Sequence, residues 1–337
     1  MIHEQAMLRS TRTNRARLAA LLALASVALG VGCHLVIGVE ERSQGDVDAS
    51  TRDADARDDA EVGPGPADGG SDGREGCDLA KPFGTPAPLS ALNSVDGEFG
   101  ATLSVDELEI FYTTTATGRA VVHRAVRRKR TDPFDPGAVV AELATIPPPH
   151  WSVALGRDDN EIFVTGRSPP RDIYRATRPR RDAPFSGAVR VAFEGWDAGA
   201  AEEQVFASAA GQLYLGVQQG PQFDLYVAPP DDAGGNLAPV PLVFFNTTGA
   251  SEAWPVQSFD GLTFYYSSGD GISEEILQSR RSNVATPFPA GTALTFPASP
   301  RKHPLWLSPD GCRLYLSQDN VPGGGGGADL FVAERPP

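Results

Sequence analysis

Ser308-Pro-Asp-Gly-Cys-Arg-Leu-Tyr-Leu316 decides the fold, because it joins a tight turn to an apolar strand and related stretches recur upstream. The Pro-Asp-Gly portion is typical of a turn, in which glycine adopts backbone angles that other residues avoid. The Leu-Tyr-Leu portion is typical of a β-strand. After a glycine run, a second strand-like segment follows at Asp329-Leu-Phe-Val-Ala333. The whole span therefore predicts two β-strands joined by a loop.

Four weaker copies of this stretch lie upstream at a nearly constant spacing. Successive copies begin 52, 52, 50 and 50 residues apart. Their first residues are Ser104, Gly156, Ser208, Ser258 and Ser308. A fixed period of this length indicates a repeat fold, in which each repeat forms one supersecondary unit.

Each repeat contains further apolar stretches that are typical of strands. One precedes the turn, and another follows the first strand after about ten residues, as at 329–333. A Pro-Phe pair then opens an extended segment at Pro133, Pro184 and Pro287, whereas the third copy has the apolar segment 239–245 instead. Four strands in about 50 residues predict one blade of a β-propeller.

The repeat pattern also resembles a known family. Ser-x-Asp-Gly-x-x-Leu-Tyr followed by Asp-Leu-Tyr-Val-Ala is similar to the WD-like propeller repeat of the TolB type, and the resemblance covers 77–337. This family is common among exported bacterial proteins, so the resemblance implies a propeller outside the cytoplasm. Some copies depart from the pattern, since Glu107 and Asp159 replace the glycine of the turn and Ala210 replaces its aspartate.

The two ends of the repeat region predict how the ring closes. The fifth copy ends at Arg335 without a Pro-Phe segment, and the missing segment lies ahead of the first copy at 81–89. An N-terminal strand that completes the last blade would leave no exposed sheet edge at the junction. We therefore predict an all-β fold, a five-bladed β-propeller of four-stranded antiparallel blades whose last blade is completed by the N-terminal strand.

The cysteines fit the same closure. Cys77 lies just before the closing segment, and Cys312 lies in the fifth copy. In an oxidising compartment these two residues could form a disulfide that stabilises the closure. The alternative is a pair of free thiols.

The N-terminal segment predicts export. Four arginines precede an apolar run from Leu18 to Val31, and Leu29-Gly-Val-Gly-Cys33 resembles a bacterial lipoprotein box. The resemblance implies that residues 1–32 are removed as a signal peptide and that Cys33 carries the lipid. Two alternatives remain: an uncleaved transmembrane anchor, because apolar character continues to Val39, or simple secretion.

A linker joins the signal to the repeats. Between Glu40 and Gly76 there are 12 acidic residues against four arginines and few large apolar side chains. Such a segment cannot bury enough surface to offset its ordering entropy, so 33–76 is predicted to be a disordered, extended tether. Calcium binding at its Asp-x-Asp spacings is disfavoured, because no terminal glutamate follows at the required offset.

The charge of the chain excludes some partners. The formal net charge is −14, which repels phosphate backbones and argues against nucleic acid. The one basic cluster, 124–130, is predicted to be a solvated strand end.

One repeat position carries candidate site residues. Six residues before each aligned turn, near one mouth of the predicted channel, lie Glu98, His150, Glu202, Glu252 and Lys302. The three glutamates could serve a glycoside-cleaving enzyme, which needs a separated pair of carboxyl groups. The competing interpretation is structural, because a residue that recurs at one repeat position is expected to hold neighbouring blades together. We favour the structural interpretation and assign no catalytic residue.

Other motifs give no chemistry. The five histidines lack metal-ligand spacing, so no metal site is predicted, and no cofactor either. The glycine run 323–327 lacks the Lys-Ser/Thr of a phosphate loop and is predicted to be a hairpin loop. Trp151, Trp254 and Trp306 precede their turns and are expected to pack between blades, with a sugar-stacking platform as the alternative.

Together these observations predict a lipid-anchored protein of the bacterial cell envelope, on the outer-membrane or periplasmic side. The propeller of 77–337 is expected to be a monomeric, non-catalytic binding module for an envelope protein or glycan. The alternative function is a carbohydrate-active hydrolase with Glu98, Glu202 and Glu252 at the channel.

Overall fold

A computed structural model describes residues 76–337 apart from 168–170, 197–199, 231–236, 298 and 320–326. The predicted signal peptide, Cys33 and the linker up to residue 75 lie outside the described residues. Within the described part, no helix has the length and apolarity needed to cross a membrane.

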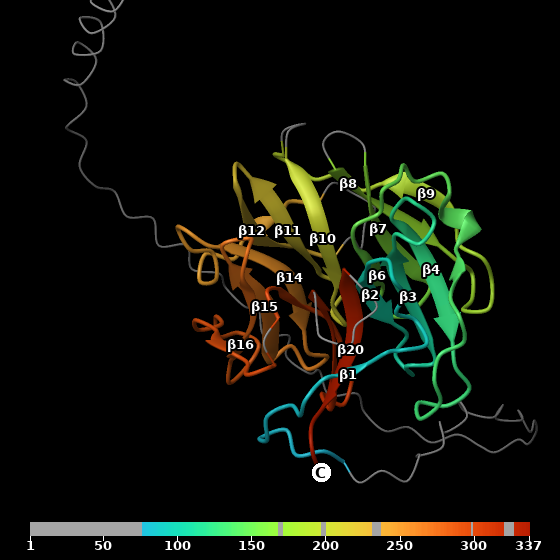
Figure 1. The fold of residues 1–337 in the computed structure, drawn as a ribbon. Coiled ribbons are helices and arrows are strands. Elements are labelled where there is room, and N and C mark those ends of the chain that lie inside the picture. The colour runs from blue at the N-terminus through green and yellow to red at the C-terminus, as the bar shows by residue number, and fades with distance from the viewer. Residues whose placement is uncertain (1–75, 168–170, 197–199, 231–236, 298, 320–326) are drawn as a thin grey trace, which may run out of the picture. The chain divides into compact units, whose positions relative to one another are not determined.

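The described chain forms five four-stranded antiparallel sheets, which confirms the predicted five-bladed propeller (Figure 1). Blade 1 contains β2 (Glu98–Leu103), β3 (Glu109–Thr114), β4 (Val121–Val126) and β5 (Ala138–Val139). Blade 2 contains β6 (Val153–Leu155), β7 (Glu161–Arg167), β8 (Arg171–Thr177) and β9 (Ser186–Arg190). Blade 3 contains β10 (Ala201–Ala207), β11 (Leu213–Gln219), β12 (Gln222–Ala228) and β13 (Val240–Pro241).

The last two blades follow the same plan. Blade 4 contains β14 (Ser251–Gln257), β15 (Thr263–Gly269), β16 (Glu274–Arg280) and β17 (Thr292–Ala293). Blade 5 contains β18 (Lys302–Leu307), β19 (Arg313–Asp319), β20 (Ala328–Glu334) and β1 (Ala87–Pro88). The inner strands β2, β6, β10, β14 and β18 contact one another in a closed ring. The only helical turn in the described chain is a 3-10 turn at Ala141–Leu143.

The ring closes as the sequence predicted. β1 pairs antiparallel with β20, in the register Ala87 with Val332 and Pro88 with Phe331, and the two strands lie side by side in Figure 1. β1 is short because proline cannot donate to a strand ladder, which restricts it to edge positions. The N-terminal segment therefore supplies the outer strand of the last blade.

The turn between the first two strands of each blade explains why the repeat can have other residues in place of glycine. In blade 5 the Ser308 hydroxyl donates to Asp310 at 2.5 Å, and the Cys312 N–H donates to the same carboxylate at 3.0 Å. The fourth residue of the turn is left-handed in all five blades, with φ between 59° and 81°. These residues are Glu107, Asp159, Gly211, Gly261 and Gly311. The two acidic departures thus keep the turn geometry of glycine.

Hydrophobic residues of the middle strands fill the seams, the faces where one blade packs against the next. Three buried clusters are shared between neighbouring blades, with Phe264 and Leu316 in the largest, Phe111 and Ile162 in the second, and Leu215 in the third. Burial of these apolar faces is what drives blades to pack around an axis.

An arginine that follows the third strand recurs in four blades. Each of these arginines donates its Nε to the carbonyl of the left-handed turn residue of its own blade, at 2.7 to 3.2 Å. Each guanidinium also lies 3.9 to 4.5 Å from the ring centre of the phenylalanine in the Pro-Phe segment. The four are Arg127, Arg178, Arg281 and Arg335. The sequence prediction for 124–130 is therefore wrong in part, because Arg127 has a packing role, whereas 128–130 are exposed.

Candidate functional site at the channel mouth

The five candidate residues come together at one end of the inner strands, but their side chains are buried. Glu98, Glu252 and Lys302 are 1 to 2% exposed, and His150 and Glu202 are 4% exposed. Glu98 and Lys302 are the first residues of β2 and β18, and the other three lie at or just before the start of their inner strands. The arrangement places them inside the seams rather than in open solvent.

Glu98 and Glu252 have the same hydrogen-bond environment. The Glu98 carboxylate accepts from the Ser94 N–H at 2.9 Å, the Ser94 hydroxyl at 2.6 Å and the Thr114 hydroxyl at 2.9 Å. Glu252 accepts from the N–H and hydroxyl of Thr247 at 3.1 and 2.7 Å, and from Ser268 at 3.2 Å. Each glutamate thus fixes the loop that connects the preceding blade to its own.

Two asparagines in the same loops were missed by sequence reasoning. The Asn93 side chain donates to the Leu330 carbonyl at 3.0 Å and accepts from the Leu330 N–H at 2.9 Å. Asn246 makes the same pair of bonds to Leu225, at 3.0 and 2.7 Å. An Asn-Ser/Thr pair five or six residues before the glutamate was the available signal. Together, each asparagine and glutamate anchor one connecting loop to both adjacent blades.

Glu202 differs from the other two glutamates. Burial raises its pKa to about 7, with a further rise from the nearby Asp172 carboxylate and an opposing effect of Arg190. Burial also raises the pKa of Glu98 and Glu252, but their hydrogen bonds from the connecting loops oppose the rise. Glu202 is therefore the glutamate of the ring that takes up a proton most readily.

His150 and Lys302 complete the ring with structural roles. The His150 ring accepts from the Val122 N–H at 3.4 Å, and its Nε2 lies 3.1 Å from the Ile146 carbonyl. Burial lowers the pKa of His150, which keeps the ring neutral. The Lys302 ammonium lies 2.8 Å from Glu275 and donates to the Ser299 carbonyl at 3.0 Å. Both residues join one blade to the next.

The three tryptophans divide between packing and the channel. Trp306 is buried and packs edge-on against Tyr315 of its own blade and against Phe259 in the turn of blade 4, as expected. Trp151 is only half-buried; its ring lies 5.8 Å from Phe99, and the Arg171 guanidinium lies 4.4 Å above it. Trp254 is also half-buried and lines the channel.

Trp254 has an unusual backbone. Its φ is +54°, in the left-handed region that a bulky residue rarely occupies. The equivalent residue of blade 1 is Gly100, with φ +53°. The Trp254 ring stacks on His303 of the next blade at 4.8 Å, and His303 Nε2 lies 2.5 Å from a Glu274 oxygen. A second group of this kind surrounds Trp151, where Arg171 also forms an ion pair with Glu203.

The channel holds a small space on its axis. Residues from all five inner strands, Trp254 and Gly100 among them, line this space, which has room for about one water molecule. Within the described residues, no group of three or more His, Cys, Asp or Glu side chains is placed to hold a metal ion.

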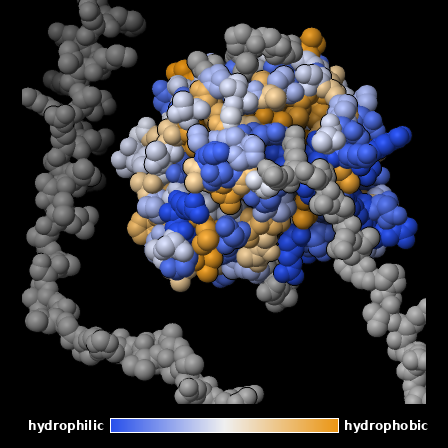
Figure 2. Space-filling model, turned by 90° about the horizontal axis from the view of Figure 1, so that it is seen from below, coloured by the Kyte–Doolittle hydropathy of each residue, from blue (hydrophilic) through white to orange (hydrophobic). Residues whose placement is uncertain are grey.

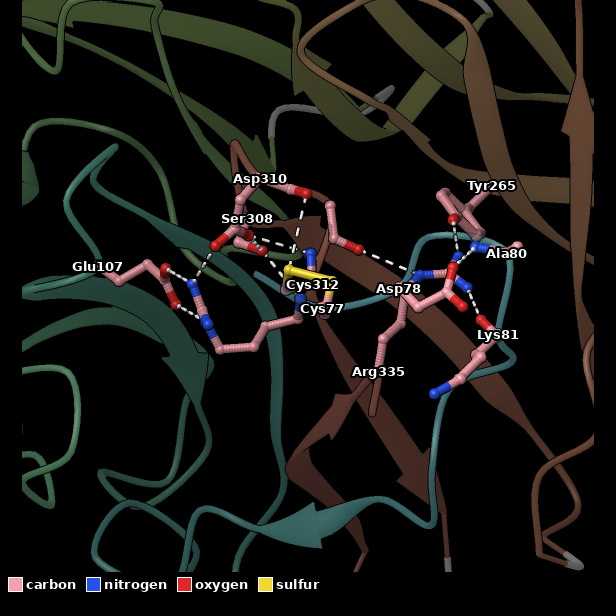
Figure 3. The surroundings of a disulfide bond; sticks show 12 residues. Cys77, Asp78, Ala80, Lys81, Glu107, Tyr265, Ser308, Asp310, Cys312 and Arg335 are labelled. Atoms are coloured by element: carbon pink, nitrogen blue, oxygen red, sulfur yellow. Dashed lines mark hydrogen bonds and ion pairs between the residues drawn. A yellow bond between two sulfur atoms is a disulfide. The ribbon is translucent and has the colours of Figure 1, made fainter. Parts of the chain in front are cut away.

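The opposite end of the blades carries the disulfide. Cys77 is bonded to Cys312, as the sequence predicted, across a separation of 235 residues (Figure 3). Close by, the Arg335 guanidinium donates to the Lys81 carbonyl and to the Tyr265 hydroxyl, and Arg313 binds Glu107 (Figure 3). The closing segment is thus held by the disulfide, by the hydrogen bond from Arg335 to Lys81 and by the pairing of β1 with β20.

Figure 2 shows hydrophilic and hydrophobic residues interspersed over one face of the propeller. Exposed large apolar side chains such as Val139, Val189 and Val240 lie on outer strands, which is ordinary for a protein surface.

Comparison with known proteins shows the fold. No family model matches the chain, and no curated protein matches its sequence. Similar solved structures include TolB from Acinetobacter baumannii, with 14% identity over 72% of this chain and a TM-score of 0.44. This chain covers 56% of that TolB.

Two glycoside hydrolases are more similar in shape. The GH43_1 enzyme from Xanthomonas citri has 14% identity over 74% of this chain and 89% of its own, with a TM-score of 0.52. A thermostable family-43 glycoside hydrolase has 12% identity over 75% of this chain and 92% of its own, also with a TM-score of 0.52. At such low identity the likeness is one of fold alone.

Proposed function

We propose that this chain is a non-catalytic binding module of the bacterial cell envelope, which presents the channel mouth to a protein or glycan. The proposal rests on the burial and the hydrogen bonds of the candidate glutamates. Glu98 and Glu252 each accept three hydrogen bonds from the protein and are almost fully buried. Carboxylates held in this way have structural partners and face no open substrate site.

The half-buried aromatic residues supply the contact surface in this proposal. Trp151 and Trp254 combine apolar rings with adjacent charged groups, Arg171 on one side and His303 with Glu274 on the other. Binding sites combine aromatic surface with a few placed polar groups in this manner. The left-handed backbone of Trp254 also supports a role, because strained residues of this kind concentrate at ligand sites.

Binding can be tested with two variants and a matched control. Purified peptidoglycan and solubilised envelope proteins serve as separate probes, which distinguishes a glycan from a protein partner. Trp151→Ala and Trp254→Ala are expected to weaken capture by at least tenfold, whereas Val139→Ala on an outer strand leaves it unchanged. Equal capture by the parent and both tryptophan variants, or no capture of either probe, would refute the proposal.

A second candidate is a carbohydrate-active hydrolase, and one observation favours it. The pKa of Glu202 is raised to about 7, the range in which a carboxyl group serves as general acid, and the family-43 hydrolases share the fold. Release of reducing sugar from a polysaccharide panel by the parent, abolished in Glu202→Gln but not in Glu161→Gln, would establish this alternative. No release by the parent removes it.

Membrane attachment is a separate part of the proposal. We infer a lipid on Cys33 from the resemblance of residues 29–33 to a lipoprotein box. Palmitate labelling of the parent but not of Cys33→Ser supports the anchor. A parent protein that stays unlabelled, or a Cys33→Ser variant that is still labelled, contradicts it.

A further inference from the structure

One pairing recurs at the seams of the ring on the side of the channel mouth. The acid at the start of the third strand of one blade faces the candidate residue of the next blade. The blade 4–5 seam shows the geometry directly, since Glu275 on β16 meets Lys302 on β18 at 2.8 Å. In the blade 2–3 and 3–4 seams, the same positions hold Asp172 with Glu202 and Asp224 with Glu252.

Two buried carboxyl groups at one seam cannot both ionise without a cost. Like charges in a poorly solvated site repel each other, which adds to the rise in the pKa of the buried glutamate at each of these two seams. At the blade 3–4 seam, the donors from Thr247 and Ser268 stabilise the charged form of Glu252. At the blade 2–3 seam, Arg190 forms an ion pair with Asp172 at 2.6 Å, and burial raises the pKa of Glu202, so Glu202 is the acid of this pair to which we assign the proton.

We propose that the blade 2–3 seam is a proton-binding joint: Glu202, buried beside the ion pair of Asp172 with Arg190, holds a proton, and release of that proton loosens the ring there. This inference concerns the joint between blades and does not depend on any ligand of the channel mouth. The charged groups that face Glu202 are Asp172 on β8 and Arg190 on β9. The next residue along β10, Glu203, is paired with Arg171.

Other groups set the background of the experiment. Burial lowers the pKa of His123 and His150, so the stability that they contribute is lost as the pH falls. Glu202 changes the stability in the opposite direction. Its pKa is raised, so the stability that it contributes is present at low pH and is lost as the pH rises through the pKa of the folded state. The pH dependence of the stability of the parent therefore contains contributions of both kinds. For this reason each variant is compared with the parent at every pH.

The test measures urea unfolding of the parent, Glu202→Gln, Glu202→Lys and Glu161→Gln between about pH 5 and pH 8.5. Glutamine keeps the shape of the side chain without a charge to lose. Lysine copies the Lys302–Glu275 seam. Glu161 is a half-buried glutamate in an ordinary ion pair with Arg175 and serves as control.

We expect the unfolding constant of the parent, relative to that of Glu202→Gln, to rise on the order of 100-fold between the two ends of this range. Relative to the parent, Glu202→Lys should be stabilised most at the high-pH end of the range. The unfolding constant of Glu161→Gln relative to that of the parent should not change with pH. A constant ratio for Glu202→Gln across the range overturns the proposal. If Glu202→Gln does not fold, carboxyl NMR of the parent decides, because a Glu202 midpoint near that of a free glutamate overturns it equally.

Discussion

Glu107 and Asp159 occupy the same left-handed position in neighbouring blades, and their surroundings differ sharply. Both are acidic residues where three other blades have glycine. Glu107 is fully buried, receives two bonds from Arg313 at 2.6 and 2.7 Å, and accepts from the Tyr315 hydroxyl at 2.9 Å. Asp159 accepts only a long bond from the Val105 N–H at 3.3 Å, and its Oδ1 has no hydrogen-bond partner among the described residues.

Side-chain length and the facing residue explain the difference. Glutamate is one methylene longer and reaches Arg313 across the blade 5–1 seam. The residue aligned with Arg313 in blade 1 is Glu109, whose carboxylate is bound by Arg178. Asp159 therefore faces an acid where Glu107 faces a base, and burial raises its pKa to about 6. A non-glycine residue in the left-handed region costs about 1 to 2 kcal/mol, and only Glu107 has a partner that offsets this cost.

The largest expected effect comes from the covalent bond at the Glu107 seam. Replacement of both Cys77 and Cys312 by serine removes a cross-link between residues 235 positions apart. The loss should lower the free energy of unfolding by up to about 5 kcal/mol, because the unfolded chain is no longer constrained. The measurement is urea unfolding under oxidising conditions. An unchanged midpoint would mean that the noncovalent contacts of the closing segment are sufficient by themselves.

Glu107→Gly should destabilise the fold by about 3 kcal/mol, because loss of a buried ion pair leaves Arg313 uncompensated while relief of the turn returns only part of the energy. The same measurement on Glu107→Gln separates loss of charge from loss of the side chain. A neutral or stabilising Glu107→Gly would show that the ion pair contributes less than the backbone strain.

Asp159→Gly should have the opposite sign and stabilise the fold by about 2 kcal/mol at pH 7. The folded state binds more protons than the unfolded state between pH 3.8 and about 6, so the stability of the parent falls as pH rises through that window. The gain of the variant should therefore be larger at pH 7 than at pH 4. Thermal unfolding at both pH values checks this, and a gain confined to pH 4 contradicts it.

Arg130→Ala should have the smallest effect, about 0.5 kcal/mol or less. The Arg130 side chain is 38% exposed and lies 3.5 Å from Glu107, so water and salt screen the pair. Urea unfolding with and without added salt provides the measurement. A loss of stability comparable to that of Glu107→Gly would mean that the exposed Arg130, and not Arg313, is the main partner of Glu107.

Local patterns in the sequence were enough to predict the blades and their closure. The turn residues of 308–311 determine where a strand begins, and the period of the turns determines the number of sheets. The missing outer strand after Arg335 and the spare segment at 81–89 predicted the pairing of β1 with β20. These features depend on residues close together in the chain, or on one simple count.

The partners of the candidate site residues were not predictable in the same way. The acid that faces Glu202 is Asp172, about 30 residues away and in another blade, and only the packing angle brings them together. Trp254 follows Ala and precedes Pro, so no glycine in the sequence marks its left-handed backbone. For Glu98 and Glu252 the sequence analysis expected bonds to a neighbouring blade, whereas the structure has bonds to the connecting loop.

The position of the disulfide determines how a mechanical load would travel through the molecule. A pull on the chain ahead of Gly76 enters the propeller at Cys77 and passes directly to Cys312, at the turn before β19. The disulfide is thus a second route for the load, parallel to the backbone that runs from Asp78 to β1. It protects the two-residue strand that closes the ring from being the first element to be peeled away.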